Sequence, residues 1–347
     1  MTHGTSAEPL LPAHPFLPPG FAPLREEGWT LPRAWPRSAD HLLLDLRDPA
    51  GSAVAGQWFS DPERARAIAE ATPGAERAGR IVLQRAGADR RLRPLAELLA
   101  APGRRLVAHR PERRAVVQAG DRFLKLVRPG RLEEVRSQAL LAAQLGVGAP
   151  EVLDADPATG SLTTRAVPGT PLTSVLSSSA ALAGCRTAGA MIARLQQQGP
   201  RVLPGTLAEH DGADELAVVR RWQTLAERFT GLAPPRERPE LPVLGSPVLV
   251  HRDLHDGQLI LDGERAGLLD FDLAALGHPA LDLANLLVHL ELRSEQGLLA
   301  DPAAATEAVL EGARAPAPVR EAIPAFAEIT RHRLRAVYAF RDPDALT

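Results

Sequence analysis

The chain contains almost no lysine and almost no cysteine. Lysine and arginine together number 40, and Lys125 is the only lysine. A genome that favours arginine explains the many arginines. A position that keeps lysine is therefore a candidate for a place where a compact ammonium is needed and a flat guanidinium does not fit. Cys185 is the only cysteine, which excludes an internal disulfide and a zinc site made of several cysteines.

The chain also lacks a strong charge of either sign and lacks long apolar runs. Its formal net charge is -2, so no overall basic field favours nucleic acid or an anionic membrane as a partner. No apolar run approaches the roughly 20 residues of a membrane-spanning helix, and residues 1–36 show no secretory signal pattern. With 45% hydrophobic residues, the composition fits a globular protein with a proper core. We expect a cytoplasmic protein.

The first hundred residues divide into an arm and a small extension. Residues 1–38 are rich in proline and show no periodicity, so we expect an extended arm without regular structure. Residues 39–103 predict a small α/β extension in which we see no chemistry. Its expected elements are strands over 41–47, 54–59 and 81–84, a helix that begins at Asp61-Pro62, and a short helix over 95–99.

The rest of the chain changes from β-rich to helical. Residues 104–168 predict a hairpin, further strands and an amphipathic helix over 131–145. Residues 169–347 predict mainly helices. A β-rich lobe followed by a helical lobe is an α+β arrangement, in which we expect a cleft between the lobes. The expected helices of the second lobe cover about 172–198, 211–230, 279–298, 302–313 and 317–339.

Ionisable residues gather at the ends of short apolar strands in the second lobe. One strand, 248–250, leads into His251-Arg252-Asp253-Leu254-His255, and another, 266–269, leads into Asp270-Phe271-Asp272. Phosphoryl transfer needs a carboxylate that orients the attacking hydroxyl, oxygen ligands for Mg²⁺, and a cation on the nucleotide phosphates. One set of these groups is supplied by Asp253, Gln258, Asp270 and Lys125.

In these motifs the chain resembles the aminoglycoside phosphotransferase and choline kinase superfamily, relatives of the protein kinases. Gln258 and Asp270 follow Asp253 by five and seventeen residues, and the resemblance covers about residues 105–340. It implies a bilobal protein-kinase-like fold. It also implies transfer of a phosphoryl group from ATP, with GTP as the alternative donor, to a hydroxyl of a small molecule in the presence of Mg²⁺.

The resemblance further implies roles for single residues. Asp253 corresponds to the catalytic base, Gln258 and Asp270 to the Mg²⁺ ligands, and Lys125 to the lysine on the α- and β-phosphates. Glu134 is the expected ion-pair partner of Lys125, with Glu133 and Gln138 as alternatives. Adenine is expected against the hinge, Thr164, Arg165, Ala166 and Val167. Supporting roles fall to His251, His255, Asp272 and Asp282, and the last of these is expected to brace the catalytic loop.

Three departures from the family pattern bear on the substrate. Gln258 replaces the usual asparagine, as in the maltokinase and glucosamine-kinase branch, and this favours a sugar or amino sugar as acceptor. Arg252 stands where small-molecule members often have glycine. The turn of the first hairpin has no glycine-rich sequence, so its arginines, Arg110, Arg113 and Arg114, either contact phosphates or lie in solvent.

Several alternatives remain open at this point. They are an aminoglycoside-type antibiotic as acceptor, a nucleotide-binding pseudokinase or regulatory module, and a protein kinase. His251 and His255 could also be zinc ligands, although no third ligand is evident. A P-loop, a dinucleotide fingerprint and a nucleophile elbow are absent from the sequence. Candidate acceptor-binding residues are Asp211, Asp214, Glu291 and Arg333.

Overall fold

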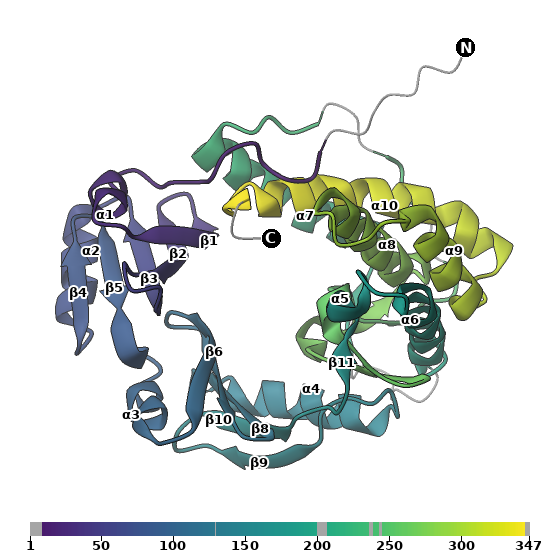
Figure 1. Cartoon of the computed structure of the whole chain (residues 1–347), viewed down its shortest axis with the longest axis horizontal. Coiled ribbons are helices and arrows are strands. Elements are labelled where there is room, and N and C mark those ends of the chain that lie inside the picture. The colour runs from purple at the N-terminus through teal and green to yellow at the C-terminus, as the bar shows by residue number, and fades with distance from the viewer. Residues whose placement is uncertain (1–8, 129, 200–206, 236–238, 243–244, 344–347) are drawn as a thin grey trace. The chain divides into compact units, whose positions relative to one another are not determined.

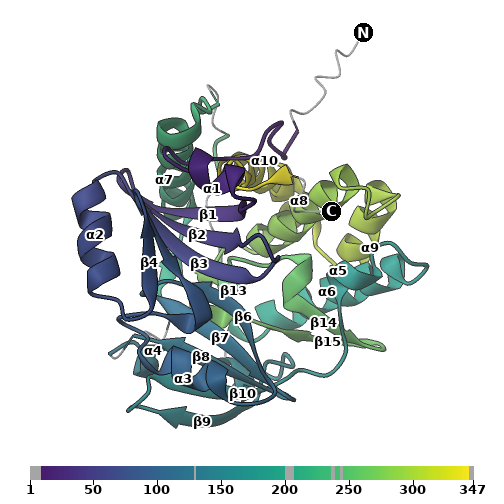
Figure 2. The ribbon, with the colours of Figure 1, turned by 60° about the vertical axis from the view of Figure 1, so that its left-hand side comes forward.

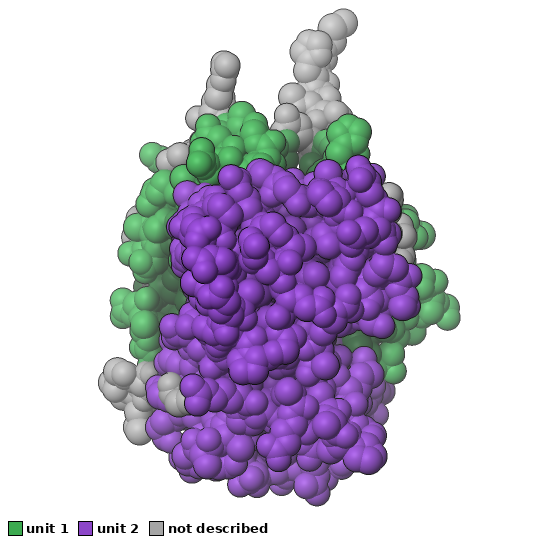
Figure 3. Space-filling view, turned by 90° about the vertical axis from the view of Figure 1, so that its left-hand side faces the viewer, with its two compact units in different colours: residues 1–15, 170–258, 274–347 green, residues 16–169, 259–273 purple. Residues whose placement is uncertain are grey.

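The computed structural model describes residues 9–128, 130–199, 207–235, 239–242 and 245–343. The chain forms two compact units, coloured in Figure 3. The first consists of Met1–Pro15, Thr170–Gln258 and Ala274–Thr347, and the second of Phe16–Gly169 and Leu259–Leu273. None of the described helices is both long and apolar enough to cross a membrane.

The second unit begins with a five-stranded antiparallel sheet in the order β1-β2-β3-β5-β4 (Figure 1). Helix α2 (Pro62–Glu70) packs against β3, β4 and β5. It begins as predicted, because the Asp61 carboxylate accepts a hydrogen bond from the Glu63 N–H and proline follows the cap. The strands are β1 (Thr30–Ser38), β2 (His41–Arg47), β3 (Ala53–Phe59), β4 (Ala75–Ala78) and β5 (Ile81–Gln84).

The prediction of an irregular arm over residues 1–38 is wrong for its C-terminal part, because the chain forms α1 (Ala22–Glu26) and β1 there. Prolines within β1 argued against a strand, but β1 lies at an edge of the sheet and pairs only with β2. An edge strand tolerates residues that donate no hydrogen bond. Trp29 and Leu31 are buried and fix this segment to the sheet. Residues 1–8 of the predicted arm lie outside the described residues.

A second five-stranded sheet, in the order β6-β7-β8-β10-β9, follows in the same unit (Figure 2). Strand β7 pairs with both β6 and β8 in the predicted antiparallel succession. Buried side chains of β7 and β8, among them Val117 and Leu126, form a core with Leu95. The elements are α3 (Pro94–Ala100), β6 (Arg104–Arg110), β7 (Arg114–Ala119), β8 (Arg122–Val127), α4 (Leu132–Gln144), β9 (Val152–Asp156) and β10 (Ser161–Arg165).

One hairpin from the C-terminal half of the chain also belongs to the second unit. Strands β14 (Leu259–Asp262) and β15 (Arg265–Leu268) pair antiparallel. The Leu268 N–H donates to the Val147 carbonyl at 3.2 Å. The short helical turn η4 (Phe271–Leu273) then packs against α4. The segment Asp270-Phe271-Asp272 is thereby placed beside the second sheet.

The first unit is mainly helical, as predicted, with a small sheet in the order β12-β16-β13. The fold is therefore the predicted α+β class, with a β-rich N-terminal region and a helical C-terminal region. The elements are β11 (Thr170–Pro171), α5 (Leu172–Val175), α6 (Ala181–Gln196), β12 (Glu209–His210), α7 (Gly212–Thr230), β13 (Val248–Val250), β16 (Ala275–Gly277), α8 (Ala280–Glu295), α9 (Pro302–Ala313) and α10 (Ala317–Tyr338).

The helix predicted over 172–198 is wrong in one respect, because it is interrupted between α5 and α6. Ser178 lies in the interruption. Its hydroxyl donates to the Val175 carbonyl at 2.7 Å and accepts from the Ala180 N–H at 3.2 Å. Such local hydrogen bonds from serine compete with the helical backbone ladder, so the chain turns before α6 begins.

Helices α6 and α9 pack closely through glycine. A Cβ atom at Gly189 would overlap the carbonyl oxygen of Val309, and one at Gly312 would overlap that of Arg186. Cys185 on the same helix is fully buried. Burial raises the pKa of its thiol to about 11. The only cysteine is therefore a core residue and not a reactive thiol.

Candidate active site

The loop after β13 adopts an unusual backbone conformation. Arg252 has φ = 70°, in the left-handed region that costs a residue with a Cβ about 1 kcal/mol or more. The loop is held from α8, since the Asp282 carboxylate accepts hydrogen bonds from the backbone N–H groups of His251 at 2.6 Å and Arg252 at 2.8 Å.

Asn285, which the sequence did not indicate as a site residue, supports the same loop. The Asn285 side chain donates to the Arg252 carbonyl at 2.9 Å. Its own oxygen accepts from Thr330 at 2.9 Å and from Arg333 at 3.0 Å. Asp282 and Asn285 are completely buried, and burial raises the pKa of Asp282. Asp282 and Asn285 lie three residues apart at the start of α8, among apolar residues, and such residues share one helix face. This pattern was the signal in the sequence that could have indicated Asn285.

Asp253 itself is half-buried. Its carboxylate makes no hydrogen bond or ion pair with any part of the chain that the structure describes. The backbone on either side is fixed by the contacts of Arg252 and by the buried Leu254. Asp253 is therefore a rigidly placed carboxylate with all its acceptor capacity free.

The next acidic residue, Asp256, is engaged. It is fully buried, accepts from the Thr173 hydroxyl, and forms an ion pair with Arg293 at 2.8 Å. These contacts tie the loop to α5 and α8. They were not predicted, because Thr173 and Arg293 are far from Asp256 in sequence.

His255 has a structural role. Its Nδ1 accepts a hydrogen bond from the Gly257 N–H at 3.0 Å, so this nitrogen is not available as a zinc ligand. The ring lies against that of His289, with centroids 5.1 Å apart. Burial lowers the pKa of His255 and, more strongly, of His289.

Gln258 ends the short turn η3 (Asp256–Gln258). Its side chain is 7% exposed, and its Oε1 atom has no hydrogen-bond partner among the described residues. A buried carbonyl oxygen without a partner costs about 1–3 kcal/mol and therefore requires an explanation. A cation ligated by this oxygen provides one.

A second group of candidate site residues lies within the other unit. The Lys125 ammonium on β8 lies 2.6 Å from the Asp272 carboxylate and 3.4 Å from that of Asp270. Arg114 on β7 lies 3.0 Å from Asp272 and 3.6 Å from Asp270. The structure therefore brings Lys125 together with the acidic segment. Arg114 also contacts this segment. The sequence had left open whether this arginine contacts phosphates or lies in solvent.

The expected ion pair between Lys125 and Glu134 is not formed. Glu134 lies 2.7 Å from Arg131 on its own helix, and the ammonium of Lys125 contacts Asp272 and Asp270 instead. Arg131 and Glu134 are three residues apart, so they meet on one exposed helix face. The alternatives are not partners either. Glu133 pairs with Arg136 at 3.2 Å, and Gln138 reaches only the Asp272 carbonyl, at 3.5 Å.

The predicted adenine-binding segment lies at the end of β10. Thr164 pairs with Phe123 of β8 in the sheet register. Arg165 forms ion pairs with Glu151 and Asp121, and the Ala166 N–H donates to the Asp121 carbonyl at 2.8 Å. The backbone of Val167 makes no hydrogen bond to the backbone of the described residues, whereas the Ala166 N–H is engaged.

The candidate acceptor-binding residues have structural partners. Asp211 and Asp214 cap the start of α7 reciprocally. Glu291 pairs with Arg331 at 2.7 Å, and Arg333 belongs to the Asn285 network. The buried pair of His210 and Glu215, 2.8 Å apart, was not predicted.

Histidines that are partly or fully buried predict a pH-dependent stability. Burial lowers the pKa of five of them, so the folded chain holds these rings neutral while the unfolded chain protonates them below about pH 6.5. Stability should therefore fall as pH falls through this range, by up to about 1.4 kcal/mol per pH unit for each such ring. Asp282, whose pKa is raised by burial, has the opposite effect on stability, but it is a single group. The five are His41, His255, His278, His289 and His332.

Urea unfolding of the wild type at pH 7.5 and 5.5 tests this, together with the variant His289→Leu. The wild type should be clearly less stable at pH 5.5, and the variant should lose part of that difference. Equal wild-type stability at the two pH values would contradict the assignment of neutral buried rings.

The family of the chain follows from a comparison with models of known families. The model described as "Phosphotransferase enzyme family" matches residues 109–322, which is more than half of the chain. The chain belongs to this family. The match confirms the predicted superfamily and makes the protein a small-molecule phosphotransferase that acts on hydroxyl groups. The maltokinase and glucosamine-kinase branch stays a prediction.

Solved structures of other phosphotransferases are similar to this one. An aminoglycoside phosphotransferase, APH(3'')-Id from Streptomyces rimosus, is 18% identical, with 71% of this chain and 96% of that chain covered and a TM-score of 0.48. A macrolide 2'-phosphotransferase from Brachybacterium faecium is 20% identical, with 66% and 81% covered and a TM-score of 0.46. A choline/ethanolamine kinase family protein from Mesorhizobium loti is 22% identical, with 70% and 97% covered and a TM-score of 0.39. A search of curated proteins found no match.

Proposed function

We propose that this phosphotransferase moves the γ-phosphoryl group of ATP to a hydroxyl of a sugar or amino sugar. The acceptor oxygen forms a bond to the γ-phosphorus, the bond between that phosphorus and the bridging oxygen breaks, and ADP leaves. The proton of the hydroxyl passes to the Asp253 carboxylate. The observation that supports this most directly is the free carboxylate of Asp253 followed by the buried, unpartnered oxygen of Gln258.

The donor set fits Mg²⁺. This ion takes oxygen ligands, usually one or two from protein side chains and the remainder from phosphates and water. In our proposal Gln258 Oε1 and the Asp270 carboxylate are the protein ligands. Bound Mg²⁺ would neutralise charge on the transferred phosphoryl group. Asp270 has φ = 58°, and a strained conformation of this kind often marks a functional position.

Lys125 and Arg114 supply the cations for the phosphates. Both lie against Asp272 at 3.0 Å or less, so the second aspartate of the segment holds them in place. With Asp270 they form a group of two positive and two negative side chains. Lys125 is 19% exposed and Arg114 is 28% exposed, so both can reach a ligand. Adenine is proposed to lie against Thr164 to Val167.

The sugar preference depends on Gln258 and is tested by an acceptor screen. Amino sugars, disaccharides and aminoglycosides are assayed with ATP and with GTP in the presence of Mg²⁺. Turnover with a sugar or amino sugar supports the proposal, and turnover confined to aminoglycosides contradicts the substrate class. Thermal stabilisation by ATP and Mg²⁺ without turnover on any acceptor would indicate a pseudokinase instead.

Replacement of Gln258 by leucine should separate metal binding from packing. The leucine side chain is apolar and lacks the carbonyl oxygen, so we expect a loss of at least about 100-fold in turnover, partly recovered at high Mg²⁺ concentration. Gln258→Asn should keep most of the activity.

Gln198→Leu is the matched control. Gln198 is also 7% exposed and also has an unpartnered Oε1 within the described residues, but we give it no role in catalysis. An equal loss in both variants would show that the Gln258 effect is one of packing.

A further inference from the structure

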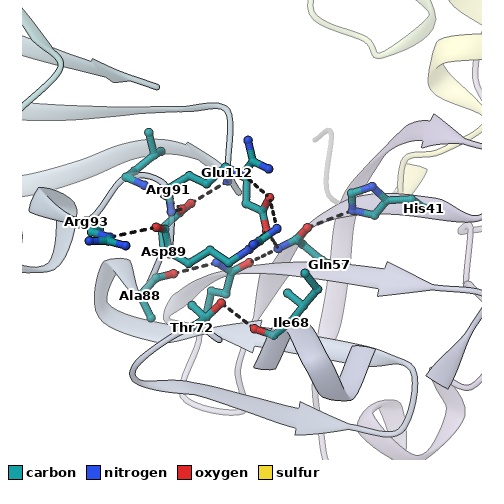
Figure 4. Close-up of polar contacts among 12 residues, drawn as sticks. His41, Gln57, Ile68, Thr72, Ala88, Asp89, Arg91, Arg93 and Glu112 are labelled. Atoms are coloured by element: carbon teal, nitrogen blue, oxygen red, sulfur yellow. Dashed lines mark hydrogen bonds and ion pairs between the residues drawn. The ribbon is translucent and has the colours of Figure 1, made fainter. Parts of the chain in front are cut away.

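The turn between β6 and β7 is held by side chains of the N-terminal extension. In the protein kinases a flexible glycine-rich loop covers the nucleotide phosphates. Here the corresponding turn, Pro111-Glu112-Arg113, contains no glycine, and Glu112 adopts φ = 60°. A non-glycine residue persists in such a conformation only where its surroundings enforce it. Figure 4 shows these surroundings.

The first anchor is Asp89, which is 6% exposed. Its Oδ2 accepts a hydrogen bond from the Glu112 N–H at 2.7 Å and lies 2.9 Å from Nε2 of His109 at the end of β6. Its Oδ1 accepts from the N–H groups of Arg91 and Leu92. One buried carboxylate thus joins the backbone of the extension to the end of β6 and to the middle of the turn. These contacts keep the pKa of Asp89 below its usual value in spite of burial.

The second anchor is the Glu112 side chain, which points back into the extension. It forms a two-point contact with Arg90, at 2.7 and 3.0 Å, and a third contact with Arg91 at 3.1 Å. Two-point contacts between arginine and a carboxylate fix orientation as well as distance. Gln57 of β3 lies 3.5 Å from Glu112 and continues a buried chain of amides to Gln84 at 3.0 Å.

A third contact comes from the edge strand. The guanidinium of Arg110 lies over the ring of Trp35 on β1, 5.0 Å from its centroid, the arrangement of a cation–π contact. Strands β1 and β3 and the segment 89–91 therefore all contact the turn or the end of β6 that leads into it. The residues that make these contacts precede residue 109, where the family match begins. They are Trp35, Gln57, Asp89, Arg90 and Arg91.

The turn ends with Arg113, and Arg114 follows at the start of β7. Arg114 contacts Asp272 and Asp270, as described above. Arg113 lies in a cationic group with Arg37, Arg114, Arg128 and Arg131, and burial and these neighbours lower the pKa of Arg113 to about 10. Neighbouring guanidiniums are suited to a polyanion, since arginine forms two-point contacts with phosphate.

We propose that Asp89 and Glu112 are positioning residues of the phosphotransferase. They fix the β6–β7 turn, so that Arg113 and Arg114 present guanidiniums to the nucleotide triphosphate where other kinases use backbone amides of a mobile loop. The extension is thus part of the nucleotide-binding apparatus. The inference depends on the proposed use of ATP. Its physical basis is that a preorganised group loses less freedom when the ligand binds.

Glu112→Gln is the main test, because the amide keeps the shape and removes the charge. We expect the KM for ATP to rise at least about fivefold, since charge-assisted contacts of the carboxylate are lost, with the acceptor KM changed by less than about twofold. Hydrogen exchange of the 109–114 amides should quicken in the same variant. Glu112→Gly, which favours the turn backbone but lacks the carboxylate, should show the same rise in KM.

Two arginines provide a matched pair. Arg90→Gln removes a partner of Glu112 and should raise the KM for ATP. Arg85→Gln removes a guanidinium of similar exposure whose partners, Asp48, Glu76 and Trp29, do not contact the turn, and should leave the KM for ATP unchanged. A similar effect of both replacements would mean general destabilisation and would overturn the inference.

The outcomes separate this inference from the proposed function. A wild type that turns over ATP, with a Glu112→Gln variant unchanged in KM and in hydrogen exchange, overturns the inference alone. A wild type that neither binds nor consumes ATP overturns the proposed function, and the inference with it.

Discussion

Replacement of Asp253 by asparagine should lower kcat by at least about a hundredfold, the usual contribution of a general base or an orienting carboxylate. The stability should change little, because the carboxylate has no partner within the described residues and replacement of such a group usually costs less than about 0.5 kcal/mol. The KM values for both substrates should stay similar, since the carboxylate acts on the hydroxyl in the transition state. Steady-state kinetics and thermal unfolding of the purified variant give all three quantities.

Asp262→Asn is the control for this experiment. Asp262 is an exposed carboxylate at the end of β14, to which we give no role in the reaction. It should leave kcat unchanged. An Asp253→Asn variant with wild-type turnover would contradict the assignment of Asp253, and an unfolded variant would contradict the free state of its carboxylate.

Replacement of Lys125 by methionine should be nearly as damaging. The ammonium is the cation closest to Asp272 and also lies near Asp270, and its loss removes charge from the proposed phosphate site. We expect kcat/KM for ATP to fall at least about a hundredfold. Lys125→Arg should not restore the activity, because a planar guanidinium does not reproduce a compact ammonium with three donors. Arg122→Met on the same strand, 58% exposed, is the control.

Because Lys125 is the only lysine, chemical labelling tests the same residue without mutation. An amine-reactive reagent can modify only this side chain and the terminal amine. Saturating ATP with Mg²⁺ should slow modification of Lys125 and not of the terminus. Equal rates with and without ATP, or full activity of Lys125→Met, would contradict the proposed contact with phosphate.

Local pattern was sufficient to predict much of the fold. The cap at Asp61, the hairpin of β6 and β7, and helices α7 to α10 follow from periodicity, turn residues and caps, all of which act over a few residues. The errors occur where a distant part of the chain decides. Prolines in β1 are tolerated because of the place of β1 in the sheet, which its own sequence does not report. Ser178 ends α5 through its own backbone hydrogen bonds, a signal that was present but weak.

In the candidate site, too, local patterns were predictable and the effects of distant residues mostly were not. The segment from His251 to His255 and the segment Asp270-Phe271-Asp272 are contiguous in sequence and were predicted as motifs. Most contacts between distant residues were not predicted, although the resemblance implied that of Asp282 with the loop. The partner of Lys125 was predicted wrongly for this reason. Glu134 is close in sequence and of the right charge, but Asp272, which contacts Lys125, lies 147 residues away.

The side-chain contacts that hold the β6–β7 turn could not have been predicted from the residues alone. Asp89 and Glu112 are ordinary acidic residues in segments without a motif. Their importance appears only when one carboxylate is seen to contact both the end of β6 and the backbone of the turn, and the other to contact two arginines. For this reason the sequence of the extension indicated no role in the reaction.

Transfer of label from γ-labelled ATP to a small-molecule acceptor tests the central claim most directly. With wild-type protein, Mg²⁺ and the best acceptor from the screen, the label should appear on the acceptor in amounts equal to the ADP formed, and the Asp253→Asn variant should transfer almost none. Label that appears only as inorganic phosphate, or that is transferred equally well by the variant, would contradict phosphotransfer directed by Asp253.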